Sequence, residues 1–444
     1  MGQSFFFYDL ETSGLKARED RIMQFAGQRT DFDLNPLGSP VNILVKMTSD
    51  ALPSPGAINV TGITPQKTLD EGVNEAEFCR IAQEEIFTPG TVALGYNTVR
   101  FDDEFMRAIF WRNFYDSYEW EWKDGRSRWD MLDVVRMTRA LRPDGINWPF
   151  TLEGKPTNRL ELITRENGLS HEHAHDALSD VYATIAVAKL IKEKQPKLFR
   201  FLFENRGKRE VQKMVNLANP QPVVYSSGRY SNEFNKTTVV IPIGAGRNGN
   251  ILVYDLRYNL DELLKAERPN FYPIVKEIGL NKCPAVAPLV VLNESDGWEK
   301  IGLTKEIIDN NLKALRKHPE FIEQRCAEIQ KTPEWPPAVE PEQALYDGFL
   351  NDADRIKVEA VRNANANELA DFHPDFDDMR LPELLLHFKG RNFPESLSEH
   401  EAKKWEEYRM ARLKRQLPVF LAELDKVSDD FVKEELRLYL ESLA

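Results

Sequence analysis

The stretch SFFFYDLET, residues 4–12, begins as an apolar run of strand length and ends in two acidic residues. In an extended backbone, residues i and i+2 point to the same side, so the carboxylates of Asp9 and Glu11 face one point in space. Two carboxylates held that close repel each other unless a cation lies between them, and hard divalent ions such as Mg²⁺ bind in this way. The alternative is a pair of solvated acids at the end of a strand.

The segments around this strand predict an α/β domain. Apolar runs over residues 22–32 and 41–47 flank a turn-rich stretch and suggest a meander with the first strand. Another short strand is expected over residues 91–96, and residues 104–114 have the apolar spacing of a helix. The clearest helix follows Asp176, a good N-cap residue, and carries an apolar stripe formed by Val181, Ile185, Ala188 and Ile191.

Pro196 lies just past this helix, and the pattern changes there, so the first domain is assigned to residues 1–196. The next segment, residues 197–335, begins with a basic amphipathic stretch and continues with β-rich runs at 221–226, 237–243 and 251–256. These runs predict a small domain built around a sheet or barrel, which helical patterns between residues 304 and 329 close. A linker rich in Pro and Glu, residues 332–342, leads into a last domain, residues 343–444, that is almost entirely helical in pattern.

Length, charge and cysteine content limit the classes of function. The chain has 444 residues, and no apolar run approaches the roughly 20 residues of a membrane span. The N-terminus has no basic stretch before an apolar one, which favours a cytoplasmic protein. The net charge of −13 argues against bulk electrostatic coating of nucleic acid, so a polyanion would have to meet a local basic surface or a metal. Cys79, Cys283 and Cys326 form no CxxC pair, which supports neither a disulfide framework nor a cysteine zinc site.

Two further acidic patches lie in the first domain. Asp102, Asp103 and Glu104 follow a strand and open a helix, although the helix dipole alone also favours acids in a first turn. His175 lies just before the last helix of the domain and Asp180 lies one turn inside it, so both can project toward a shared site. A zinc site is the alternative for the histidine-rich segment, but the segment offers no fourth soft ligand. The three patches together are more specific than any one of them.

In their order along the chain, these motifs resemble the DEDDh class of 3′→5′ exonucleases, with Asp9 and Glu11 in the first motif, Asp102 in the second and His175 with Asp180 in the third. The strings FYDLETSGL, ALGYNTVRFDDEF, SRWDMLDVVR and AHDALSDVYATIAVAKLIK resemble the exonuclease I family of bacterial single-strand-specific DNA exonucleases. So do LNKCPAVAP, LYDGFLNDADR and GRNFPESL, beyond the first domain. The resemblance implies a ribonuclease H-like exonuclease domain with a mixed sheet, then a small SH3-like β-barrel domain and a C-terminal all-helical domain.

The resemblance also implies a mechanism. Asp9, Glu11 and Asp180 would ligate Mg²⁺, with Asp9 bridging two ions, and Asp102 would hold the second ion partly through water; Mn²⁺ could substitute. Two such ions stabilise the attacking and leaving oxygens of an in-line displacement at phosphorus. His175 would take the proton from the attacking water, since an imidazole with a pKa of about 6.5 can be neutral at physiological pH. The products would be 5′-mononucleotides released from a 3′-hydroxyl end.

The segment over residues 100–142 interleaves arginines with aromatic residues and is the best candidate for holding a single strand. Aromatic platforms contribute roughly 1–3 kcal/mol per stacked base whatever its identity, and arginines contact phosphates. Trp111 and Phe114 have helical spacing and are expected in the core. Arg159 could contact the scissile phosphate, or form a surface ion pair with Glu161 or Glu166. The candidate substrate contacts are Glu11, Arg107, Tyr118, Trp122, Arg136 and Arg159.

By the same resemblance, single-stranded DNA is the substrate, and the acidic C-terminal tail of the single-strand DNA-binding protein is a partner. Candidate contacts for this tail are basic residues that could equally form a solvated helix face, namely Arg142, Arg206, Lys208 and Arg209. The resemblance favours a monomer without membrane association, in the bacterial cytoplasm near the nucleoid.

We therefore expect a 3′→5′ exodeoxyribonuclease that acts in DNA repair and recombination. The first alternative is an exoribonuclease of the same superfamily, because the catalytic motifs do not distinguish sugars. Such enzymes usually consist of the catalytic domain alone, whereas this chain has two more. The second alternative is a non-catalytic scaffold that binds single strands, which would not need all five catalytic side chains.

Overall fold

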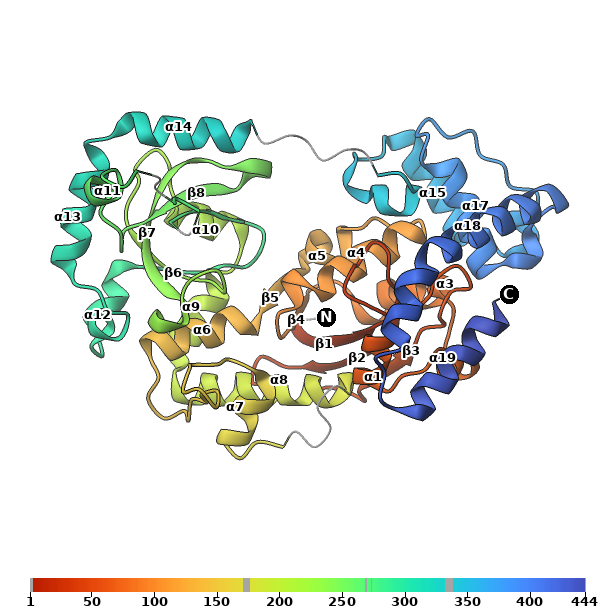
Figure 1. Cartoon of the computed structure of the whole chain (residues 1–444), viewed down its shortest axis with the longest axis horizontal. Coiled ribbons are helices and arrows are strands. Elements are labelled where there is room, and N and C mark those ends of the chain that lie inside the picture. Colours follow the sequence, from red (N-terminus) through yellow and green to blue (C-terminus); the bar gives the residue numbers. More distant parts are fainter. Residues whose placement is uncertain (1–2, 171–175, 268–269, 273, 332–337, 444) are drawn as a thin grey trace.

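The computed structural model describes residues 3–170, 176–267, 270–272, 274–331 and 338–443, which form three regions (Figure 1). The N-terminal region is a five-stranded sheet covered by helices. The middle region, at the upper left of the view, contains a second sheet, and the C-terminal region, along the right side, is helical. Both later regions contact the N-terminal one.

The first sheet is mixed, in the order β3-β2-β1-β4-β5. Strand β1 (Ser4–Thr12) pairs antiparallel with β2 (Ile22–Thr30), which pairs antiparallel with β3 (Val41–Leu44). On its other side β1 pairs in parallel with β4 (Thr91–Gly95), and β4 in parallel with β5 (Ser127–Asp130). The carboxyl ends of β1, β4 and β5 therefore meet at one edge of the sheet.

Alternate residues of β1 face two different cores. Phe6, Tyr8 and Leu10 pack on one side of the sheet, whereas Phe5 and Phe7 belong to the core on the other side. Helix α8 (Ala177–Lys194) contributes its apolar stripe to the second of these cores and crosses β1 and β2. Because side chains alternate along a strand, the residues that continue the second face point toward the start of α8.

The other helices of the N-terminal region pack around this sheet. They are α1 (Pro55–Thr61), α2 (Pro65–Glu71), α3 (Glu75–Ile81), α4 (Asp102–Arg112), α5 (Glu119–Trp122), α6 (Met131–Leu141) and α7 (Leu160–Glu166). Helices α9 (Pro196–Glu204) and α10 (Lys208–Met214) lead to the middle region. The rings of Phe199 and Phe203 on α9 lie 5.0 and 5.2 Å from that of Trp129 on β5, so α9 is anchored to the N-terminal region. The division after residue 196 stays a prediction.

The middle region is an antiparallel sheet in the order β10-β6-β7-β8-β9. Its strands are β6 (Val223–Ser226), β7 (Thr237–Ala245), β8 (Ile251–Asp255), β9 (Val275–Ile278) and β10 (Ala285–Pro288). Around the sheet lie α11 (Leu260–Leu263), α12 (Gly297–Lys300), α13 (Lys305–Arg316) and α14 (Pro319–Gln330). The sequence pattern predicts β6, β7, β8 and the last two helices, but it misses β9 and β10.

The C-terminal region confirms the helical prediction. Its helices are α15 (Asp352–Asn363), α16 (Ala366–Ala370), α17 (Leu381–Asn392), α18 (Glu399–Leu424) and α19 (Asp430–Ser442). Part of the linker predicted over residues 332–342 lies outside the described residues, and a 3₁₀ helix (Pro341–Tyr346) follows it. The remaining short turns are a π-helix at Ala82–Ile86 and 3₁₀ helices at Thr98–Arg100, Lys123–Gly125, Asn232–Phe234, Arg247–Gly249, Leu289–Asn293 and Pro394–Ser396.

Most elements predicted for the N-terminal region are confirmed. The meander is β1, β2 and β3, and Asp176 caps α8 as expected. Pro196 does more than end that helix, because it begins α9, where its missing N–H is tolerated. The sequence pattern misses β5, in which charged residues alternate with uncharged ones over only four positions. Trp111 and Phe114 are buried, as predicted. Within the described part of the chain, no helix combines the length and apolar character needed to span a membrane.

Candidate active site

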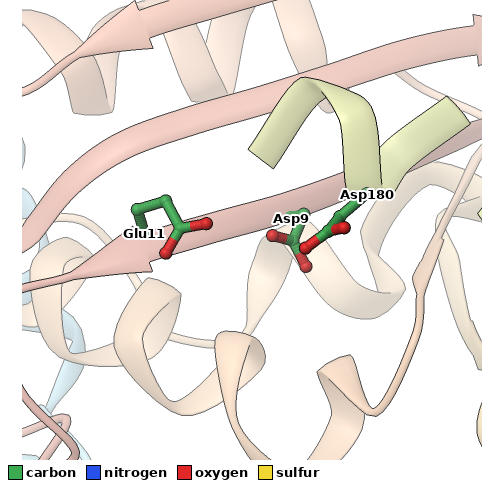
Figure 2. A group of neighbouring side chains, drawn as sticks. All are labelled: Asp9, Glu11 and Asp180. Carbon is green, nitrogen blue, oxygen red and sulfur yellow. The ribbon is translucent and has the colours of Figure 1, made fainter. Parts of the chain in front are cut away.

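Three acidic side chains meet where β1 passes under the first turn of α8. Asp9 and Glu11 continue the face of β1 that α8 covers. The carboxylate of Asp176 accepts a hydrogen bond from the Ser179 backbone N–H at 3.0 Å, and this cap sets where the helix begins. Figure 2 shows the result: the carboxylates of Asp9 and Asp180 point toward each other, and Glu11 reaches toward them from farther along the strand.

The spacing of these oxygens suits a metal ion. One carboxylate oxygen from each of Asp9, Glu11 and Asp180 lies within 4.8 Å of the others. All three donors are oxygens, which hard cations such as Mg²⁺ prefer, whereas softer metals prefer sulfur or imidazole. The sequence-based prediction of a metal group formed by these residues therefore matches the geometry. We call these three residues the acid cluster.

Burial and mutual repulsion make the acid cluster unfavourable without a cation. The pKa of Glu11 is raised to about 9, mainly by burial and then by Asp9 and Asp180. The pKa of Asp9 is raised well above its ordinary value by burial, and then by Asp102 and Asp180. A cation among the carboxylates would favour their ionised forms. The fit of this group to a divalent ion thus rests on its charge as well as its spacing.

Asp102 lies beside the acid cluster rather than within its 4.8 Å group. It opens α4, and its buried carboxylate accepts a hydrogen bond from the Leu10 backbone N–H at 3.1 Å. Leu10 stands between the two acids of β1, so this bond ties the start of α4 to the strand. The expected contact of Asp102 with a second ion through water stays a prediction. The proposed base, His175, lies outside the described residues, as does the rest of segment 171–175.

The structure separates the predicted substrate contacts into exposed and buried groups. Trp122 is 64% exposed and free to stack on a base. Arg159 is exposed, and its guanidinium lies 3.9 Å from the Glu161 carboxylate, so the predicted surface ion pair exists only loosely. Arg107 is buried, and it donates to Glu104 at 2.6 Å and to Glu121 at 2.5 Å.

Arg107 also supports another predicted contact. Its guanidinium carbon lies 5.6 Å from the centre of the half-buried Tyr118 ring, and the ring of Phe349 lies 6.2 Å from that of Tyr118. This arrangement indicates that Arg107 holds Tyr118 in place. Direct contact of Arg107 and Tyr118 with a substrate stays a prediction.

Sequence reasoning did not identify the basic surroundings of Arg136. Burial lowers the pKa of Lys276 to about 8, and Arg229 and Lys236 add to this effect while Asp255 opposes it. The pKa of Lys236 is also lowered, by burial and then by Arg136. We call Arg136, Arg229, Lys236 and Lys276 the basic cluster. Arg136 belongs to α6 and the others to the middle region, so only folding across this boundary could reveal the cluster.

Two of the four residues suggested for binding an acidic tail have their guanidinium groups engaged within the chain. Arg142 donates to the Val291 carbonyl oxygen at 2.9 Å. Arg206 donates to the Arg128 carbonyl oxygen at 3.2 Å and to a serine hydroxyl on β5. Lys208 and Arg209 are exposed at the start of α10. Those two are therefore the better placed to meet a partner.

Comparison with known families assigns each of the three regions. The family model described as Exonuclease matches residues 6–188. The model of the Exonuclease I SH3-like domain matches residues 206–331, and that of the Exonuclease I C-terminal domain matches residues 339–444. The mixed-sheet, SH3-like and helical architecture expected from the sequence is thereby confirmed.

Similar proteins span nearly the whole chain. Exodeoxyribonuclease I of Haemophilus influenzae is 39% identical over 443 residues, which cover 96% of this chain and 93% of that protein. The crystal structure of E. coli exonuclease I in complex with a dA16 oligonucleotide has a TM-score of 0.94 at 36% identity, with both chains fully covered.

Two further solved structures bear on ligands. The zinc-bound form of the E. coli exonuclease I complex with single-stranded DNA has a TM-score of 0.93 at 35% identity, over 100% of both chains. A structure of SSB and exonuclease I in complex with the inhibitor CFAM has a TM-score of 0.90 at 36% identity, again over 100% of both chains. The ligands belong to those structures. This chain is similar over its full length to the exonuclease I chain in each of them.

Proposed function

The chain belongs to the exonuclease I family, and from this premise we propose that it is a 3′→5′ exodeoxyribonuclease that degrades single-stranded DNA to 5′-mononucleotides. The observation that carries the proposal is the convergence of Asp9, Glu11 and Asp180 in a chain that also has both accessory domains of the family. By the same relationship the protein would act in bacterial DNA repair and recombination, in the cytoplasm near the nucleoid.

We propose that Asp9, Glu11, Asp180 and Asp102 would hold two Mg²⁺ ions, with Asp9 serving as a ligand to both. When bound, these ions supply positive charge to the attacking and leaving oxygens at phosphorus, and Mn²⁺ can replace them. The carboxylates suit this role because burial and repulsion disfavour their ionised forms in the absence of a cation. His175 would accept the proton of the attacking water, and Glu11 would also contact the terminal nucleotide.

Contacts outside the acid cluster would hold the strand without reading its sequence. The exposed Trp122 offers a stacking platform, and stacking tolerates every base. The basic cluster around Arg136 offers a site for phosphates, because an anion would relieve the repulsion among its four cations. The exposed Arg159 would reach the scissile phosphate, and Tyr118 on its Arg107 support would reach a base.

The proposal is tested by digesting 5′-labelled single-stranded DNA, duplex DNA and single-stranded RNA in Mg²⁺. We expect stepwise shortening of the DNA single strand alone, with nucleoside 5′-monophosphates as the released product. Asp9→Asn and His175→Ala should lose this activity, whereas Asp70→Asn, which changes an exposed acid on α2, should keep it. Faster loss of RNA would instead indicate the ribonuclease alternative. If no substrate is degraded, the protein is better explained as a non-catalytic scaffold that binds single strands.

We also propose that the protein docks the acidic C-terminal tail of a single-strand DNA-binding protein. The similarity to the SSB and exonuclease I structure supports this partner. Lys208 and Arg209 are the candidate contacts, because both side chains are exposed on α10. The strand itself would be bound by one copy of the chain, as a monomer.

A further inference from the structure

Three consecutive residues of the SH3-like domain contact the N-terminal domain beside α4. They lie in the loop between β9 and β10, within the string LNKCPAVAP. The Asn281 carbonyl oxygen accepts a hydrogen bond from Arg128 Nη2 at 2.8 Å, and Lys282 Nζ lies 2.9 Å from Glu104 Oε1. Cys283 Sγ donates to the Arg128 carbonyl oxygen at 3.3 Å. We call residues 281–283 the docking loop.

The backbone of the docking loop is held in an unusual conformation. Cys283 has φ of +48°, in the left-handed region that residues other than Gly, Asn and Asp rarely adopt. Such a conformation persists only where the surrounding contacts determine it. The contacts made by Asn281 and Lys282 on one side and the Cys283 thiol on the other are of this kind. The loop therefore has one defined position against the N-terminal domain.

Arg128 connects the docking loop to residues that adjoin two candidate metal ligands. Its buried guanidinium pairs with the Asp103 carboxylate and with Glu121 at 2.9 Å. The other oxygen of Asp103 accepts a hydrogen bond from the hydroxyl of Tyr8. Tyr8 immediately precedes Asp9, and Asp103 immediately follows Asp102. One guanidinium therefore lies between the SH3-like domain and the neighbours of two candidate metal ligands.

Glu104 adds a second link, one residue farther along α4. Its Oε1 accepts hydrogen bonds from Lys282 Nζ and, at 2.6 Å, from Arg107 Nη1. Its Oε2 accepts a hydrogen bond from the Tyr346 hydroxyl. Lys282 belongs to the SH3-like domain, Tyr346 to the C-terminal region and Arg107 to the N-terminal domain. All three regions thus meet on the first turn of α4, the turn that begins with Asp102.

We propose that the docking loop positions the first turn of α4, so that the SH3-like domain sets the placement of Asp102 relative to Asp9 in addition to any contact it makes with DNA. This inference rests on the proposed nuclease function. Arg128 and Lys282 are positioning residues, since neither belongs to the acid cluster. A buried carboxylate such as Asp103 keeps its place only while its charged partner keeps its own, and a displaced Asp103 carries Asp102 with it.

The test uses full-length Lys282→Met and Arg128→Lys variants. Lys282→Met removes the contact with Glu104 from a partly exposed site, and Arg128→Lys keeps the charge but loses the fork that spans Asp103 and Asn281. We expect Mn²⁺ titration, followed calorimetrically in the absence of DNA, to show the weaker of two ions bound about 10-fold less tightly, with the tighter ion unchanged. Lys282→Arg should restore the binding. Lys265→Met, which removes an exposed pair with Glu262, is the matched control.

A small substrate separates positioning from DNA holding. The p-nitrophenyl ester of thymidine 5′-monophosphate carries no DNA beyond the reacting nucleotide, so its hydrolysis does not depend on holding a longer strand. We expect a lower kcat with an unchanged KM in Lys282→Met and Arg128→Lys. Wild-type Mn²⁺ binding and ester turnover in both variants, with only the KM for DNA raised, would overturn the positioning role.

Two controls keep these outcomes distinct. If Arg128→Lys fails to fold, as judged by its thermal unfolding, the surface variant Lys282→Met decides alone. If the wild-type protein neither binds Mn²⁺ nor degrades DNA, the proposed nuclease function fails and the positioning role fails with it. If the wild-type protein is active and both variants behave like it, only the positioning role is excluded.

Discussion

Two groups of carboxylates, one around Asp9 and one around Asp50, have opposite electrostatic character. In the acid cluster, burial and neighbouring acids raise the pKa of Glu11 to about 9. The second group is an ion cluster, in which Arg21 pairs with Asp50 at 3.1 Å and Arg391 pairs with Asp50 at 2.7 Å. Burial favours the neutral form of Asp50 too, but Arg391, Arg21 and Arg412 hold its pKa well below the ordinary value.

The carboxylates of the two groups have different roles. The ion cluster joins elements far apart in sequence, because Glu342 and Arg391 come from the C-terminal region. Its charges are compensated inside the protein, so it contributes to docking of that region. For the acid cluster we propose that an added cation supplies the balancing charge. Whether a buried carboxylate serves stability or chemistry is therefore decided by the charges that the fold brings to it.

Removing an acid from the acid cluster should have the largest effect on activity. Asp9→Asn is expected to abolish Mg²⁺ binding and to lower the rate of nucleotide release by at least about 1000-fold. In EDTA the same variant should unfold at a higher temperature than the wild type, because one of several repelling carboxylates is gone. Calorimetric titration, nucleotide release and thermal unfolding check these three outcomes. Unchanged Mg²⁺ binding would remove the bridging role of Asp9.

The matching change in the ion cluster should act on stability instead. Asp50→Asn leaves buried guanidinium groups without their compensating charge, and loss of one partner of a buried pair costs about 3–5 kcal/mol. We expect a lower midpoint of denaturant unfolding, with nuclease activity retained by the folded fraction. The exposed Asp70→Asn should unfold like the wild type. An unchanged midpoint in Asp50→Asn would mean that the comparison between the clusters does not hold.

Acid should weaken the ion cluster through Glu75, which pairs with Arg112 at 2.8 Å. Burial raises the pKa of Glu75, but Arg112 and Arg21 outweigh it and bring the value to about 2, from 4.5 ordinarily. A depressed pKa stabilises the folded state above the ordinary pKa, and this contribution is lost as the pH falls toward 2. The contribution is roughly 3 kcal/mol at neutral pH.

Unfolding free energies measured between about pH 6 and pH 3 check this prediction. The difference in unfolding free energy between wild type and Glu75→Gln should shrink as the pH falls, because protonation removes from the wild type the carboxylate charge that the variant already lacks. A difference that stays constant with pH would assign the role of Glu75 to its hydrogen bonds alone.

Trp122 lies outside both clusters and should affect neither metal binding nor stability. Trp122→Ala is expected to raise the KM for single-stranded DNA about 10-fold, in keeping with roughly 1–3 kcal/mol per stacked base. Turnover of the p-nitrophenyl ester should stay unchanged. Phe431→Ala, which removes an equally exposed ring on α19, is the control for general surface effects. Equal KM values for both variants would exclude Trp122 from the path of the strand.

The smallest effect is expected where charges are fully hydrated. Lys208→Glu combined with Arg209→Glu should weaken binding of a peptide with the acidic tail of a single-strand DNA-binding protein by less than about 10-fold, and less again in high salt. Fluorescence anisotropy of the labelled peptide measures this change. DNA degradation in the absence of the partner should be unaffected. Unaltered peptide affinity would place the docking site elsewhere.

The sequence predicted the parts of the site that depend on local rules. The two-residue spacing of Asp9 and Glu11 places both on one face of any strand, and the capping preference of Asp176 places Asp180 in a first helical turn. The same rules failed for β5 and β9, where charged residues interrupt a short strand, and for β10, whose short apolar run ends at a proline. They also gave no reason to separate the buried Arg107 from the exposed Trp122, since both lie in one stretch of arginines and aromatic residues.

By itself the sequence determined the α/β start, the order of the three domains and the identity of the acids, because strand alternation and helix capping act over a few residues. Only the tertiary structure decided which charges face those acids. Asp103 meets Arg128, and Glu104 meets Lys282 and Tyr346, across separations of 25 to 242 residues. Electrostatic energies depend on distance in space and on burial, and neither is written in the spacing of residues along the chain.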